Sequence, residues 1–158
     1  MTNYLKLIRY RHLLVLAFMQ LIFRYGFLKL QNISLSLADW QYILLVLSTV
    51  CLAAGGAIIN AIFQQDSDSE NKPDCQVVGK FISENTAYNL YAAFTFTGVS
   101  IGFYLSNVIQ KSNFAILFIL IASTLYFYAS SMKNSILIGN IIVAFTTSIY
   151  LLLIGLFD

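Results

Sequence analysis

This chain contains five apolar stretches, each about as long as a helix that crosses a lipid bilayer. The hydrocarbon core of a bilayer is about 30 Å thick, so a spanning helix needs about 20 mostly apolar residues. By that length the sequence predicts spans at residues 13–30, 40–63, 86–108, 114–131 and 135–157. A polar loop, residues 64–85, separates the second stretch from the third.

The composition favours the same architecture and excludes several others. Apolar residues make up 59% of the 158 residues and charged residues only 10%, whereas soluble domains carry roughly 25% charged residues. We therefore expect an all-α fold, a polytopic membrane bundle of about five transmembrane helices, with residues 1–158 forming a single transmembrane domain. A net charge of +2 without a basic, aromatic-rich segment argues against nucleic acid. Cys51 and Cys75 lack the spacing of a metal or disulfide framework, so both are expected to be free thiols.

The basic residues predict an orientation, because cytoplasmic loops carry an excess of Lys and Arg. With five spans, the side that holds the N-terminus and the 64–85 loop carries Lys6, Arg9, Arg11, Lys72, Lys80 and Lys133. The opposite side carries Lys29 and Lys111. We expect the N-terminus in the cytoplasm and the chain in a bacterial inner (cytoplasmic) membrane.

Several single residues inside or beside the stretches suggest particular environments. Arg24 lies within the first stretch and has two interpretations: a side chain that snorkels to the interface, or an inward cation for an anionic ligand. His12 is expected to be an interface residue. Gly98 and Gly102 form a GxxxG pattern, which predicts close helix packing.

The most informative polar segment runs NAIFQQDSDSENKPDCQVVGK from Asn60 to Lys80. Asn60, Gln64 and Asp68 are spaced i, i+4, i+8, which would place them on one helix face. Four carboxylates follow within nine residues: Asp66, Asp68, Glu70 and Asp74. Mg²⁺ is bound by one or two carboxylates together with substrate phosphates. Charged loops in contact with solvent are ordinary, so the spacing alone favours a solvated acidic loop and leaves a metal site as the alternative.

The stretch AAGGAIINAIFQQDSDSENKPDCQVVGKFIS resembles the second span and following loop of the UbiA-type membrane prenyltransferases. The segments YLKLIRYRHLL and YASSMKNSILIGNIIVAF also resemble regions of that family, so the resemblance covers essentially the whole chain. The specific part is the loop tail, which the chain matches at Asn71, Lys72, Pro73, Asp74, Gly79 and Lys80.

In that family an aspartate-rich motif holds the diphosphate of a polyprenyl donor through Mg²⁺. The resemblance places Asn60 and Asp68 at the two ends of this motif. Ala61 and Gln64 stand where its first two aspartates belong, and Cys75 replaces an arginine of the tail. Family members are about twice as long, with nine spans and a second aspartate motif, so only their N-terminal half is expected here, with a degenerate first motif.

The resemblance therefore implies a vestigial diphosphate site and no catalytic residue. This substrate-binding site would consist of Asn60, Gln64, Lys72 and Lys80, with Asp68 as its remaining metal ligand. Loss of one oriented ligand or donor typically costs about 10² to 10³ in rate, so the chain alone is expected to be inactive.

Three functions remain open from the sequence. The first is a non-catalytic, membrane-embedded binding or assembly subunit. Its ligand would be an isoprenoid lipid. Its partners would be the surrounding membrane lipids and either another membrane protein or a second copy of the chain. The second is half of a split prenyltransferase that uses Mg²⁺ to move a polyprenyl group from its diphosphate to an acceptor. The third is a component of a small transporter or channel, which has less support.

Overall fold

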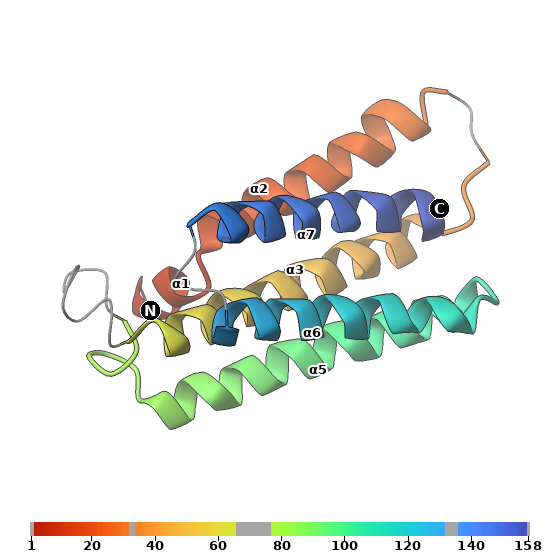
Figure 1. Ribbon diagram of the computed structural model, residues 1–158. Helices are drawn as coiled ribbons and strands as arrows, with labels where there is room; N and C mark the ends of the chain where they lie inside the picture. Colours follow the sequence, from red (N-terminus) through yellow and green to blue (C-terminus); the bar gives the residue numbers. More distant parts are fainter. Residues whose placement is uncertain (1, 32–33, 66–76, 132–135, 158) are drawn as a thin grey trace.

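A computed structural model describes residues 2–31, 34–65, 77–131 and 136–157, with the side chains of residues 2, 131 and 136–145 excluded. In this part of the chain the regular secondary structure is helical. The elements are α1 (Thr2–Leu7), α2 (Tyr10–Ile22), the π-helical segment η1 (Phe23–Leu28), α3 (Asp39–Phe63), α5 (Glu84–Val108), the short 3₁₀ turn η2 (Ser112–Phe114), α6 (Ala115–Ser131) and α7 (Ile136–Phe157). The long helices run side by side, with the two termini at opposite ends of the bundle (Figure 1). The expected all-α helix bundle is confirmed.

Three helical segments among the described residues are long and apolar enough to cross a membrane. They are Tyr10–Leu28, Asp39–Phe63 and Ser112–Ser130. Helix α5 has the required length, but polar residues such as Thr95, Ser100 and Asn107 interrupt its apolar sequence. The described apolar part of α7, Thr146–Phe157, is shorter than a span. Five crossings and one domain over 1–158 therefore stay predictions.

Helix α3 forms the centre of the bundle and packs against α2, α5 and α6. Its sequence is apolar on all sides, as expected for a helix surrounded by others. Tyr42, Leu45, Ile58 and Ile59 on α3 are completely buried. Consequently the C-terminal end of α3, which carries Asn60 and Gln64, is held by packing from neighbouring helices.

Small residues bring α5 close to α3 and α6, as the GxxxG pattern predicts. A Cβ atom at Gly98 would lie 3.0 Å from the backbone carbonyl oxygen of Ser48 on α3, and one at Gly102 would lie 2.4 Å from the ring of Phe118 on α6. The Ser48 hydroxyl donates a hydrogen bond of 2.6 Å to the Gly98 carbonyl, which fixes this contact. Backbones approach this closely only where no side chain intervenes.

Arg24 occupies a buried position at the end of the bundle opposite Asn60. Its side chain is 1% exposed and donates a hydrogen bond to the Leu37 carbonyl. Its guanidinium also lies 3.6 Å from the Asp39 carboxylate and 4.3 Å from the centroid of the Tyr42 ring. The interpretation as a side chain that snorkels to the interface is wrong, because these groups surround Arg24 with protein. Its inward direction agrees with the other interpretation, but its contacts are with the chain itself.

Candidate functional site

The predicted site residues lie at the end of α3, in the connection before α5, and in a segment outside the described residues. Asn60 lies in the last turn of α3, and Gln64 follows the end of that helix. Lys80 lies in the connection that leads to α5. Asp68 and Lys72 belong to residues 66–76, which lie outside the described part of the chain, so their predicted roles stay predictions.

Asn60 and Gln64 form a pair of neutral amides at the end of α3. The Gln64 side-chain nitrogen donates a hydrogen bond of 3.1 Å to the Asn60 side-chain oxygen. The i, i+4 spacing predicts that the two side chains share a face, and this contact confirms it. Gln64 stands where the resemblance places an aspartate, so an uncharged donor occupies the position of a metal-binding carboxylate.

Lys80 lies in the connection before α5 rather than on α3 with the amide pair. Its side chain is exposed, and its ammonium lies 5.4 Å from the centroid of the neighbouring Phe81 ring. Gly79 before it adopts a left-handed backbone with φ of 83°, and its N–H donates to the Ile82 carbonyl at 2.9 Å. A glycine suits this position because other residues rarely adopt that conformation. The conformation turns the chain between the acidic segment and α5.

The described residues include no cluster of side chains typical of a metal centre. No group of three or more His, Cys, Asp or Glu side chains among them is placed to hold a metal ion. The end of α3 offers only amide oxygens, whereas Mg²⁺ in proteins takes one or two carboxylates and phosphate oxygens. Asp66, Asp68, Glu70 and Asp74 lie in 66–76, outside the described part of the chain.

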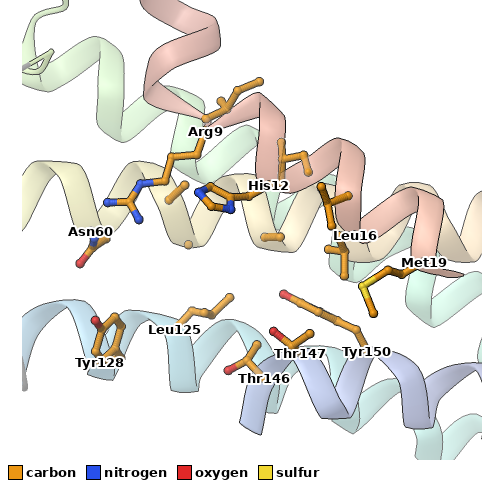
Figure 2. A pocket seen from close by; sticks show the side chains of 16 residues that line it. Arg9, His12, Leu16, Met19, Asn60, Leu125, Tyr128, Thr146, Thr147 and Tyr150 are labelled. Atoms are coloured by element: carbon orange, nitrogen blue, oxygen red, sulfur yellow. The ribbon is translucent and has the colours of Figure 1, made fainter. Parts of the chain in front are cut away.

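A cavity of about 360 Å³ opens beside Asn60, between the α1–α2 corner, α3, α6 and α7. Figure 2 shows Arg9, His12, Asn60 and Tyr128 around one part of it, and Met19 and Tyr150 around another. Apolar side chains cover most of the remaining wall: Leu13, Leu16, Ala53, Ala57 and Leu125. Thr146 and Thr147 of α7 add further polar groups to the wall. A largely apolar cavity with a few polar groups suits an amphiphilic small molecule.

The corner between α1 and α2 directs two basic side chains at this cavity. Arg9 adopts a left-handed backbone with φ of 52°, and its carbonyl accepts a hydrogen bond of 2.9 Å from the backbone N–H of His12. Because the two residues are three apart at a helix start, their side chains lie on one side. Both side chains are exposed and line the cavity. No shared role for the two residues was predicted, because no sequence pattern marks the left-handed turn at Arg9.

Tyr150 on α7 also lines the cavity, and the sequence analysis did not predict a role for it. Its side chain is only 3% exposed, and within the described part of the chain its hydroxyl has no hydrogen-bond partner. Figure 2 shows the hydroxyl pointing into the cavity from the side of α7. Tyrosine is common in membrane helices as a packing residue, so its position alone carried no signal.

Comparisons with known proteins relate the chain to one enzyme. It is 30% identical over 109 residues to a digeranylgeranylglyceryl phosphate synthase of Sulfurisphaera tokodaii, a match that covers 69% of the chain and 37% of that protein. The synthase of Metallosphaera sedula is 31% identical, with 73% and 39% covered. That of Sulfolobus acidocaldarius is 34% identical, with 67% and 36% covered. No family model and no solved structure matches the chain.

These matches agree with the resemblance carried by the loop and the surrounding helices. Each covers about two thirds or more of the chain, while the chain spans little more than a third of the length of each relative. The shared region therefore corresponds to part of a prenyltransferase. The chain is a partial homologue of the UbiA-type membrane prenyltransferases.

Proposed function

We propose that this chain is a non-catalytic UbiA-type homologue that binds an isoprenoid lipid within the membrane and acts as a binding or assembly subunit. The observation that carries this proposal is the hydrogen-bonded amide pair of Asn60 and Gln64 at the edge of the cavity. The resemblance places Gln64 where the second aspartate of the metal-binding motif belongs, whereas Asn60 matches the asparagine at one end of that motif. The described residues that line the cavity include no carboxylate.

The chemistry of prenyl transfer explains why this substitution matters. Ionisation of a prenyl diphosphate leaves negative charge on the departing diphosphate, and metal ions and cations must compensate it. A neutral amide at the position of Gln64 cannot supply the charge that holds Mg²⁺. An apolar cavity, in contrast, still stabilises a bound lipid chain when no reaction follows.

A transfer assay tests the absence of catalysis. Purified chain would be incubated with labelled geranylgeranyl diphosphate, Mg²⁺ and geranylgeranylglyceryl phosphate, an acceptor suggested by the product named for the relatives. We expect no labelled digeranylgeranylglyceryl phosphate, and the synthase of Sulfurisphaera tokodaii would serve as the positive control. A magnesium-dependent product from the lone chain would overturn the proposal.

The subunit role rests on the apolar outer surface of the bundle. Large apolar side chains such as Phe18, Phe96, Phe103 and Leu152 are exposed there, and lipid, a second copy or another membrane protein must cover them. Purification in a mild detergent tests this part. We expect a stoichiometric companion or a homo-oligomer, and a monodisperse single chain would contradict it.

A second candidate, half of a split prenyltransferase, is favoured by the relatives themselves, because all the reported matches are synthases. In this case Asp68 and the neighbouring carboxylates would hold Mg²⁺, while Lys72 and Lys80 would contact the diphosphate. Activity would then appear only when a second polypeptide is added. It would also fall by about 10²-fold or more in the Asp68→Ala variant.

We further infer the N-terminus and the 64–85 loop to lie in the cytoplasm, with the chain in a bacterial inner membrane. This inference is supported by the six basic residues on that side against two on the other. The ends of α1, α3 and α5 that flank this loop lie at one end of the bundle (Figure 1).

A further inference from the structure

We propose that helix α5 pairs with α5 of a second copy of this chain, with the two helices running in the same direction within the membrane. The contact lies along one row of residues, the α5 seam, which consists of Asn89, Ala93, Phe96, Ser100, Phe103 and Asn107. This inference rests on the proposed function, because it takes the chain as one subunit of an assembly. It adds the identity of the partner and the surface that binds it.

The α5 seam lies on the outer side of the bundle. Helix α5 packs against α3 and α6, and Figure 1 shows it at the edge of the bundle. The residues that it buries include Gly98, Gly102 and Leu105, whereas every residue of the α5 seam is exposed. Phe96 is 76% exposed and Phe103 is 58% exposed. The α5 seam is therefore a surface that the described helices leave uncovered.

Two polar side chains on the α5 seam make lipid an unfavourable cover for it. The Asn89 carboxamide and the Ser100 hydroxyl have no hydrogen-bond partner within the described part of the chain. On α6, in contrast, the exposed Ser123 hydroxyl donates a hydrogen bond of 2.8 Å to the Ile119 carbonyl. Hydrocarbon offers no partner to a polar group, whereas a neighbouring helix in the membrane does. A helix of another protein chain therefore satisfies groups that lipid would leave unpaired.

The distribution of charge makes a second copy of the chain the suitable partner. Asparagine carries both a donor and an acceptor, so Asn89 is complementary to Asn89 of the second copy. Glu84, the first residue of α5, is the only charged residue of this helix, so two copies meet along the α5 seam without repulsion between like charges. Two copies inserted in the same orientation also direct their α5 helices the same way. Identical seam residues therefore face each other.

The sizes of the seam residues suit this parallel arrangement. Successive seam residues are four and three positions apart in turn, which is the a and d spacing that keeps one side of a helix against its partner. The small residues Ala93 and Ser100 alternate with Phe96 and Phe103. Small residues allow the two backbones to approach closely. The Phe96 ring then packs as a knob into a hole whose walls include Ala93 and Ser100 of the second copy.

Disulfide cross-linking in membranes tests the pairing of identical positions. In a Cys51→Ser, Cys75→Ser background, single cysteines replace Ala93 or Ser100. Ser123→Cys on α6 is the matched control, because Ser123 is also an exposed serine near the middle of its helix. Oxidation should convert most of the Ala93→Cys and Ser100→Cys chains into dimers and leave Ser123→Cys monomeric. Cross-linking of equal extent at Ser123, or none at Ala93 and Ser100, would overturn the pairing through the α5 seam.

Dimer affinity in liposomes tests the contribution of individual seam residues. Energy transfer between chains labelled at Cys75 with donor or acceptor dyes, in a Cys51→Ser background, gives the dissociation constant from its dependence on the protein-to-lipid ratio. Phe96→Ala should raise this constant about tenfold. Phe127→Ala is the control and should not change it, because Phe127 is a 57% exposed residue of α6. Ser100→Ala should raise the constant about threefold. Equal effects of the two phenylalanine variants would overturn the α5 seam as the contact.

The outcomes separate this pairing from the proposed function. A stoichiometric companion of different sequence, without cross-linking at the α5 seam, would overturn only the second copy as partner and leave the subunit role. A single chain in both detergent and liposomes would overturn the pairing and the subunit role together. Magnesium-dependent product from the purified dimer would overturn the non-catalytic role and leave the pairing unaffected.

Discussion

Arg9 and Arg24 show how the position of a charge decides its role. Both arginines belong to the N-terminal helical region, yet Arg24 is 1% exposed and in contact with its own chain at Leu37, Asp39 and Tyr42. Arg9 is exposed and extends into a cavity. The buried arginine therefore stabilises the fold, whereas the arginine at the cavity is available to a ligand.

Replacement of Arg24 by Met should lower the free energy of unfolding by about 1–3 kcal/mol, because it removes the hydrogen bond that Arg24 donates to the Leu37 carbonyl and the contact with the Tyr42 ring. Unfolding in detergent micelles, followed by circular dichroism, measures the change. Asp39→Asn is the matched control: the Asp39 side chain is 59% exposed, so we expect a loss of at most about 1 kcal/mol. An Arg24→Met variant as stable as the original would mean that the buried contacts contribute nothing.

The amide pair at the end of α3 leads to a second prediction at the scale of single residues. Restoring carboxylates in the double variant Ala61→Asp, Gln64→Asp should create magnesium-dependent binding of a prenyl diphosphate, because Mg²⁺ takes one or two carboxylates together with phosphate oxygens. We expect affinity for geranylgeranyl diphosphate to rise about tenfold when Mg²⁺ replaces EDTA, equivalent to about 1.4 kcal/mol. The variant Ala61→Asn, Gln64→Asn is the uncharged control and should show no magnesium effect. An equal magnesium response in both variants would contradict the assignment of this position.

At the scale of elements, helix positions were largely predictable and local departures from α-helical geometry were not. The apolar stretches 40–63 and 114–131 coincide closely with α3 (Asp39–Phe63) and α6 (Ala115–Ser131). They could be predicted because a helix that spans a bilayer needs about 20 consecutive apolar residues. The π-helical segment Phe23–Leu28 was not expected. The Lys29 N–H donates a hydrogen bond of 2.9 Å to the Arg24 carbonyl, five residues earlier. This turn contains one residue more than an α-helical turn, and the apolar pattern of the sequence does not reveal the extra residue.

The packing of α5 against α6 gives a prediction that belongs to the element scale. Gly102→Ala should lower the free energy of unfolding by about 1–3 kcal/mol, the usual effect of an extra carbon in a packed core, since its Cβ would lie 2.4 Å from the Phe118 ring. Gly155→Ala in α7 is the control, because a Cβ there meets nothing within 4 Å. It should leave stability unchanged or raise it by up to about 1 kcal/mol. Equal destabilisation by the two substitutions would contradict close packing at Gly102.

At the scale of the whole molecule, the sequence predicted the family and the two amides at the end of α3, but not the cavity. Asn60 and Gln64 could be placed because they are neighbours on one helix. The cavity is formed by side chains from the α1–α2 corner, α3, α6 and α7, and such separate elements meet only through the tertiary fold. Tyr150 and Leu125, for example, share no sequence pattern with Arg9, yet all three line the same space.

The two cysteines provide a test of how the whole molecule is oriented. Cys75 belongs to the 64–85 loop, which we expect in the cytoplasm, whereas Cys51 is buried in the middle of α3. A maleimide that does not cross membranes should therefore label Cys75 in inside-out vesicles and not in right-side-out vesicles. Cys75→Ser should abolish the labelling of inside-out vesicles, because packing shields Cys51. Cys51→Ser should leave the pattern unchanged. Labelling of Cys75 from the outer face of intact cells would contradict the predicted orientation and would place the 64–85 loop outside the cell.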